Sequence, residues 1–198
     1  MGWRGVRMLP ASPVRCKTQS PGAIDMSSET SPVAIGLGSN LGQREERLRE
    51  AVVALDELLE GLRFGDLYES APVGDISQPH FLNTAVVGRS RLTPEPLLAL
   101  LKFLEQRAGR RRGERRGPRP LDLDLLLHGD TVETSAALTL PHPELRRRPF
   151  VLIPLVDAAP DLHLPPDGVA AKALAQEADR NGLVRRGWAQ PPLVDPPR

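Results

Sequence analysis

The sequence lacks the features that mark secreted, membrane-spanning or nucleic-acid-coating proteins. Cys16 is the only cysteine among 198 residues, so no internal disulfide can form and we expect a reducing, cytoplasmic setting. No apolar stretch approaches the roughly 20 residues that a membrane-spanning helix needs. The 26 basic and 25 acidic side chains leave a net charge of +1, which argues against a general nucleic-acid coat. We therefore expect a domain with neither nucleic acid nor a membrane as partner.

Both ends of the chain differ in composition from the middle. The first 30 residues carry four basic side chains and no acidic residue before Asp25, with several Pro, Ser and Gly. The absence of a continuous apolar segment there argues against a secretory signal, whereas the basic composition also fits an organelle transit peptide or a true start at Met26. We expect a disordered extension over 1–31, one domain over 32–189, and a proline-rich tail over 190–198.

The spacing of apolar residues predicts an α+β fold between these ends. The expected strands cover 33–37, 62–68, 81–89 and 121–127; the expected helices run from Gly42 to Gly61, from Thr93 to Gly109, and from Pro149 to about Pro160. The first six of these elements, in the order strand, helix, strand, strand, helix, strand, match the ferredoxin-like βαββαβ arrangement. That fold has an antiparallel sheet with both main helices on one face, and the piece after Pro149 would be an additional helix.

The segment Leu121-Asp122-Leu123-Asp124-Leu125 is the sharpest chemical feature. Alternate side chains of a strand point to opposite faces, so the leucines would enter the core and both aspartates would share the other face. Two carboxylates ~6–7 Å apart repel each other unless a cation lies between them, and Mg²⁺ favours such oxygen ligands together with substrate phosphates. Taken alone, an ordinary solvent-facing acidic strand remains the more common explanation.

An arginine-rich loop immediately precedes this acidic pair. Six arginines lie between Gly109 and Leu121: Arg110, Arg111, Arg112, Arg115, Arg116 and Arg119. Arginine binds phosphate through paired hydrogen bonds and neutralises charge during phosphoryl transfer, so the loop and the aspartates together suggest a triphosphate site. The glycines among them favour a mobile lid. A solvated charged loop or a nucleic-acid contact remains the alternative. The sequence has no Walker A motif, and the glycines of 36–42 match a dinucleotide fingerprint poorly.

Five ordered blocks resemble the 6-hydroxymethyl-7,8-dihydropterin pyrophosphokinase family, between about Val33 and about Pro165. They are Gly-Ser-Asn-Leu-Gly at 38–42, Tyr-Glu-Ser-Ala-Pro-Val-Gly at 68–74, Phe-Leu-Asn at 81–83, Arg-Arg-Gly-Pro-Arg-Pro-Leu-Asp-Leu-Asp at 115–124, and Pro-His-Pro at 141–143. The resemblance implies an ATP-dependent diphosphotransferase of folate biosynthesis, acting as a monomer on ATP and a reduced pterin. The fold that it implies is the ferredoxin-like one derived above.

The resemblance also implies residue roles. Asp122 and Asp124 would hold two Mg²⁺ ions that bridge the ATP phosphates, with Arg110 and Arg119 as further catalytic residues. The implied pterin-binding residues are Ser70, Ala71, Val73, Phe81, Asn83 and Phe150. The implied ATP-binding residues are Glu105, Arg112, Leu125, Thr139, His142 and Arg148. Two aromatic rings could sandwich a flat pterin, and an amide offers both a donor and an acceptor to its edge.

Departures from the family pattern leave alternatives open. Arg116 precedes Gly-Pro-Arg where the family commonly has Trp, so the loop would close through arginine stacking or more weakly, and Pro120 stands where Thr is frequent. An inactive paralogue is one alternative, against which the intact Asp122 and Asp124 pair argues. An RNA-binding sheet is another, but the expected strands lack the aromatic motif of such sheets. Without the motif context, Phe81 and Phe150 would be ordinary core residues.

Overall fold

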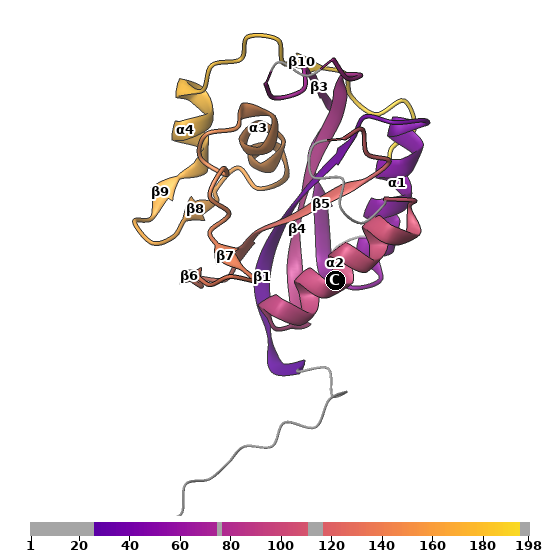
Figure 1. Cartoon of the computed structure of the whole chain (residues 1–198). Helices are drawn as coiled ribbons and strands as arrows, with labels where there is room; N and C mark the ends of the chain where they lie inside the picture. The colour runs from indigo at the N-terminus through magenta and orange to yellow at the C-terminus, as the bar shows by residue number, and fades with distance from the viewer. Residues whose placement is uncertain (1–25, 75–76, 111–116, 195–198) are drawn as a thin grey trace, which may run out of the picture.

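The computed structural model describes residues 26–74, 77–110 and 117–194 (Figure 1). In chain order the elements are β1 (Met26–Ser39), α1 (Arg44–Asp56), β2 (Glu60–Phe64), β3 (Tyr68–Ser70), β4 (Phe81–Leu92), α2 (Pro94–Arg107), β5 (Asp122–His128), β6 (Glu133–Thr134), β7 (Thr139–Leu140), α3 (Pro149–Ala158), β8 (His163–Leu164), β9 (Val169–Ala170), α4 (Ala171–Glu177) and β10 (Val184–Arg185). Arg112, Arg116 and most of the expected N-terminal extension lie outside the described residues.

The main sheet has the strand order β10-β3-β4-β1-β5, and β2 also pairs with β4. Every pairing in this sheet is antiparallel. The chain order of strands and helices is the expected βαββαβ order, and β1 lies between β4 and β5. The strand expected over 62–68 is two strands, because the chain leaves the ladder at Gly65 and rejoins it at Tyr68. The Thr84 side chain donates a hydrogen bond to the Gly65 carbonyl at this break.

Helices α1 and α2 cover one face of the sheet, as expected (Figure 1). Their apolar stripes are buried against alternate residues of β1, β4 and β5. The main contributors are Leu48, Val52, Leu55, Leu97, Leu101, Val33, Ile35, Leu37, Leu82, Val86, Leu123 and Leu125. Helix α1 ends at Asp56, before Gly61, and Leu59 reaches the core from the turn that follows it. Gly61, with φ +62°, lies within β2.

The opposite face is covered over only part of its area. Helix α3 packs there with Leu152, Ile153 and Leu155 against Ala34 and Ala85 of the sheet. Beyond α3, β1 carries Gly36 and Gly38, whose missing side chains leave the sheet surface low. A Cβ at Gly38 would meet the Asn83 amide oxygen at 3.4 Å. The uncovered half of this face is therefore where a small molecule can approach the sheet.

The C-terminal segment is bound to the edge of the sheet. Strand β10 pairs with β3, and the Trp188 indole donates to the Gly65 carbonyl at 3.0 Å. The Glu45 carboxylate accepts the backbone N–H groups of Ala189 and Gln190. Hydrogen bonds therefore hold the first residue of the segment that was expected to be a tail. The division of the chain into extension, domain and tail stays a prediction. No helix in the described ranges is long and apolar enough to cross a membrane.

Gly65 lies against the backbone of helix α3, where a side chain has no room. An added Cβ would lie 2.1 Å from the Pro154 carbonyl oxygen of α3, which is backbone and cannot yield easily. We expect Gly65→Ala to lower the free energy of unfolding by about 2–3 kcal/mol in urea denaturation. Gly36→Ala is the control, since its Cβ would meet Leu126 at an ordinary 3.5 Å. Equal stability of the two variants would contradict this packing.

Tyr68 is the single tyrosine of the chain, so its titration can be followed by absorbance. The pKa of Tyr68 is raised from 10.0 to about 12. Burial is the largest cause, and the hydrogen bond from the hydroxyl to Asp157 is the second. The fold favours the neutral phenol, so this stabilisation is complete below pH 10 and is lost as the pH rises toward 12.

Phenolate absorbance should thus titrate near 12 in folded protein and near 10 in denatured protein. Circular dichroism at each pH would show whether the chain is still folded. A midpoint near 10 in a chain with native circular dichroism would contradict the burial of this hydroxyl.

Candidate active site

A cavity of about 370 Å³ lies on the uncovered half of the sheet. It contains all six residues proposed for the pterin and five of those proposed for phosphate and metal. The cavity-lining residues from these sets are Ser70, Ala71, Val73, Phe81, Asn83, Phe150, Arg119, Asp122, Asp124, His142 and Arg148. The fold therefore brings together side chains that are up to 80 residues apart in the sequence.

Strand register explains why these residues meet. Asp122 on β5 is paired with Gly38 on β1, and Gly38 is paired with Asn83 on β4. Asn83 is in turn paired with Tyr68 on β3. Because Gly38 has no side chain, the carboxylate of Asp122 and the amide of Asn83 face each other across an open floor.

Asp122 is held by two arginines. Its Oδ1 accepts a hydrogen bond from Arg110 Nη1 at 2.5 Å, and its Oδ2 accepts one from Arg119 Nη1 at 2.5 Å. Arg110 follows the C-terminus of α2, and Arg119 precedes β5, so the ends of the arginine-rich loop both reach this carboxylate. Burial lowers the pKa of Arg110, but the Asp122 and Glu105 carboxylates raise it by more, and the net pKa lies above the ordinary value.

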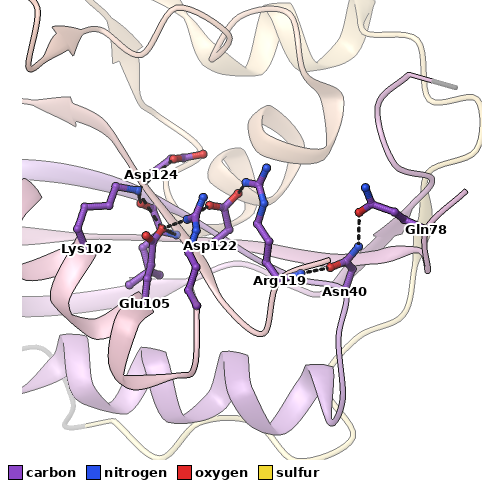
Figure 2. Close-up of polar contacts among 9 residues, drawn as sticks. Asn40, Gln78, Lys102, Glu105, Arg119, Asp122 and Asp124 are labelled. Carbon is purple, nitrogen blue, oxygen red and sulfur yellow. Dashed lines mark hydrogen bonds and ion pairs between the residues drawn. The ribbon is translucent and has the colours of Figure 1, made fainter. Parts of the chain in front are cut away.

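Glu105 on α2 shares two cationic partners, Arg110 and Lys102, with the aspartates of β5. It is 2% exposed, and its Oε1 accepts hydrogen bonds from Arg110, from the Leu123 backbone and from Lys102 Nζ, the last at 2.9 Å. Burial raises the pKa of Glu105 overall, although these three donors lower it. Lys102 also lies 3.8 Å from Asp124 Oδ1. Figure 2 shows the row from Lys102 and Glu105 to Asp122 and Arg119.

Asn40 extends this row toward the loop before β4. Its side-chain oxygen accepts the Arg119 N–H at 2.6 Å, and its own backbone N–H donates to the Arg119 carbonyl. Its amide nitrogen donates to Gln78 and to the Pro79 carbonyl, so the loop before β4 and the loop before β5 are joined through one buried amide (Figure 2). Asn40 belongs to the Gly-Ser-Asn-Leu-Gly block, but the sequence alone predicted no role for Asn40 or Lys102.

The proposed pterin residues form the second half of the cavity. The Asn83 amide nitrogen donates to Ser70 Oγ at 3.0 Å and to the Tyr68 carbonyl at 3.2 Å, which orients its oxygen toward the open side. Phe81 lines the cavity from β4 and Phe150 lines it from the start of α3. The Arg148 guanidinium lies 5.8 Å from the Phe150 ring centre, a cation–π distance.

His142 lines the cavity with a defined tautomer. Burial lowers the pKa of His142, so the neutral ring is favoured. Its Nδ1 accepts the Glu144 N–H at 3.2 Å, so the hydrogen of a neutral ring is on Nε2. An Nε2–H group is a donor for an anionic ligand.

Four of the proposed site residues that the structure describes do not line the cavity. Glu105 and Arg110 act on the carboxylates as described. Leu125 is 3% exposed and packs in the core on the α1 and α2 side of the sheet, and Thr139 lies in β7. Arg112 lies outside the described residues, so the roles of these residues toward ATP stay predictions.

The donor set fits a metal ion held jointly with a substrate. Among the described residues no group of three or more His, Cys, Asp or Glu could hold a metal ion by itself. Asp122 and Asp124 offer carboxylate oxygens on one face of β5, which suits Mg²⁺ bound by one or two carboxylates plus phosphates. Both carboxylates already pair with cationic side chains, so this position accommodates positive charge.

Comparison with known proteins identifies the family of this chain. Residues 34–160 match the family model described as 7,8-dihydro-6-hydroxymethylpterin-pyrophosphokinase. A 2-amino-4-hydroxy-6-hydroxymethyldihydropteridine pyrophosphokinase from Pseudomonas aeruginosa is 42% identical over 155 residues, which is 77% of this chain and 95% of that protein. The mitochondrial folate synthesis bifunctional protein of Arabidopsis thaliana is 46% identical over 137 residues, 68% of this chain. The matched part spans only 24% of that longer relative.

A solved structure supports the fold. The wild-type Plasmodium falciparum HPPK-DHPS structure with pterin and p-hydroxybenzoate aligns with a TM-score of 0.61 at 13% identity, over 80% of this chain and 45% of that chain. At this identity the likeness bears on the fold alone, and it confirms the ferredoxin-like expectation. The family model covers well over half of the sequence, and the P. aeruginosa relative matches at nearly full length. The chain belongs to the 7,8-dihydro-6-hydroxymethylpterin-pyrophosphokinase family.

Proposed function

We propose that this chain transfers diphosphate from ATP to the hydroxyl group of 6-hydroxymethyl-7,8-dihydropterin, giving AMP and the pterin diphosphate for folate biosynthesis. One observation carries the proposal: a single cavity joins an aromatic and amide surface to a carboxylate and arginine cluster. A reaction between a flat heterocycle and a triphosphate needs both surfaces next to each other. The family membership and the names of the bacterial relatives support the same reaction.

On one side of the cavity, Phe81 and Phe150 would stack on the pterin and Asn83 would read its edge. The hydrogen bonds from the Asn83 amide to Ser70 and to Tyr68 hold it before any ligand arrives. A side chain fixed in this way loses little freedom on binding, which favours affinity and orientation. Ala71 and Val73 would complete the wall from the loop after β3.

On the other side, Asp122 and Asp124 would hold two Mg²⁺ ions together with the phosphates. Bound there, the ions would neutralise phosphate charge and lower the pKa of the attacking hydroxyl. Arg110, Arg119 and Lys102 now partner the carboxylates, and a bound cation would free these side chains to bind phosphate oxygens. His142, with hydrogen on Nε2, and Arg148 would donate to phosphate oxygens from the segment between β7 and α3.

The proposed reaction is an in-line displacement. The pterin hydroxyl oxygen forms a bond to the β-phosphorus of ATP while the bond from that phosphorus to the oxygen bridging the α-phosphate breaks. AMP leaves with the electron pair, and Asp122 can accept the hydroxyl proton. The chain itself supplies mainly position and positive charge. The same proposal assigns nucleotide binding to four further residues: Glu105, Arg112, Leu125 and Thr139.

We also propose that residues 32–189 form a single domain that acts as a monomer in the cytoplasm. The described sheet, four helices and cavity all lie in or next to this range. Two plant relatives carry the word mitochondrial in their names, so cell fractionation would test the compartment, and sedimentation would test the monomeric state.

Substitution of Asp124 tests the reaction. We expect wild-type protein to form AMP from Mg-ATP only when the pterin is present. Asp124→Asn should lower the rate by about 100-fold or more, since such charge stabilisation contributes several kcal/mol. The control is Asp130→Asn, in the turn after β5, which should match wild type. No pterin-dependent AMP from folded wild-type protein would refute the proposed reaction.

Substitution of Phe81 tests the pterin half alone. We expect Phe81→Leu to raise the KM for the pterin about tenfold, because stacking on a heterocyclic base contributes roughly 1–3 kcal/mol. The KM for ATP should be unchanged. Phe103→Leu, on the exposed side of α2, is the matched control. An equal rise of both KM values would argue against a separate pterin surface.

A further inference from the structure

Glu69 lies next to the cavity but on the other side of β3. Its neighbour Ser70 lines the cavity, whereas Glu69 faces a surface hollow lined in part by Arg44 and Arg186. The Glu69 side chain is only 13% exposed and forms ion pairs with both arginines, through Arg44 Nη1 at 2.8 Å and through Arg186. Hydrogen bonds from Arg186 and from Arg44 lower the pKa of Glu69. The carboxylate is thus charged and bound on both sides.

Arg44 makes a second contact that connects the two strands of the pterin half. The same Nη1 donates to the His80 carbonyl at 2.6 Å. His80 immediately precedes Phe81, and Phe81 is paired with Ser70 across the β3–β4 ladder. One guanidinium at the start of α1 therefore binds the residue before Ser70 and the residue before Phe81.

Arg186 connects the same carboxylate to the C-terminal segment. It directly follows β10, which pairs with β3, and its backbone N–H donates to the Leu67 carbonyl at 2.8 Å. Strand β3 has only three residues, and a ladder this short is weakly fixed by its own hydrogen bonds. The position of β3 therefore depends on what holds its outer edge, namely β10 and the Glu69 ion pairs.

We propose that Arg44, Glu69 and Arg186 form a positioning cluster for the pterin half of the site, which rests on the proposed function. None of the three lines the cavity. They hold the end of the β3–β4 ladder where Ser70 and Phe81 face the ligand. An isolated surface ion pair contributes little, but a mostly buried carboxylate shared by two arginines is a network with charge-assisted hydrogen bonds.

The cluster should affect the binding of the pterin and leave the binding of ATP unchanged. The described phosphate-side groups lie before and on β5, on and after α2, and around α3. None of the hydrogen bonds or ion pairs described for the three cluster residues reaches them. Loss of a cluster arginine should displace Ser70 and Phe81 relative to Asn83. A merely structural role would instead loosen both halves together.

The test measures binding without turnover. Full-length protein is saturated with Mg²⁺ and a non-hydrolysable ATP analogue, and the Kd for 6-hydroxymethyl-7,8-dihydropterin is measured by calorimetry. The Kd for the analogue is measured separately. Arg44→Ala and Arg186→Ala should each raise the pterin Kd about three- to tenfold, which is the size expected for partly buried charged hydrogen bonds. The analogue Kd should stay within about twofold of wild type.

Neighbouring arginines supply matched controls. Arg47 lies one turn along α1 and pairs with Glu50, and Arg185 lies beside Arg186 but pairs with Asp66. Arg47→Ala and Arg185→Ala should therefore bind the pterin like wild type. Arg44→Lys, which keeps the charge and one donor group, should recover part of the lost affinity.

Three outcomes would overturn the inference. One is an unchanged pterin Kd in both Arg44→Ala and Arg186→Ala, and another is an equal rise of the pterin and analogue Kd values. In the third, the control variants weaken pterin binding as much as the cluster variants do. If wild-type protein itself does not bind the pterin, the proposed function fails as well, which separates that failure from a failure of the cluster alone.

Discussion

The arrangement of the site depends on two carboxylates that stand side by side on one face of β5. Asp122 and Asp124 would repel each other in isolation, so the surrounding structure has to supply positive charge. Arg110 and Arg119 both bind Asp122 at 2.5 Å, and Lys102 lies 3.8 Å from Asp124. The end of α2 and both ends of the arginine-rich loop are thereby drawn to this strand.

The sheet converts that local charge balance into a two-part cavity. Gly38 separates Asp122 from Asn83 in one row across β5, β1 and β4, and its lack of a side chain keeps the floor open. Helix α3 covers the rest of this face and contributes Phe150 at its start. The proposed phosphate half and the proposed pterin half are therefore fixed relative to each other by strand register, which is the most rigid geometry that the fold offers.

The spacing of residues along the sequence predicted which faces of individual strands and helices are buried. Alternation in 121–125 placed the leucines in the core and both aspartates on the cavity face, and helical spacing placed Leu48, Val52, Leu97 and Leu101 on buried stripes. The break of the second strand at Gly65 could not be read in this way, since it depends on the approach of Pro154 from α3. Roles for Lys102 and Asn40, and the pairing of β10 with β3, also depend on contacts between distant segments.

We propose that Asp122 and Asp124 exchange their arginine and lysine partners for metal ions that arrive with the nucleotide. Counting protein-bound Mn²⁺ by electron paramagnetic resonance, in the presence of a non-hydrolysable ATP analogue, tests this most directly. We expect two ions per bound nucleotide in wild-type protein and fewer in Asp122→Asn and Asp124→Asn. The same ion count in wild type and both variants, at equal nucleotide occupancy, would contradict it.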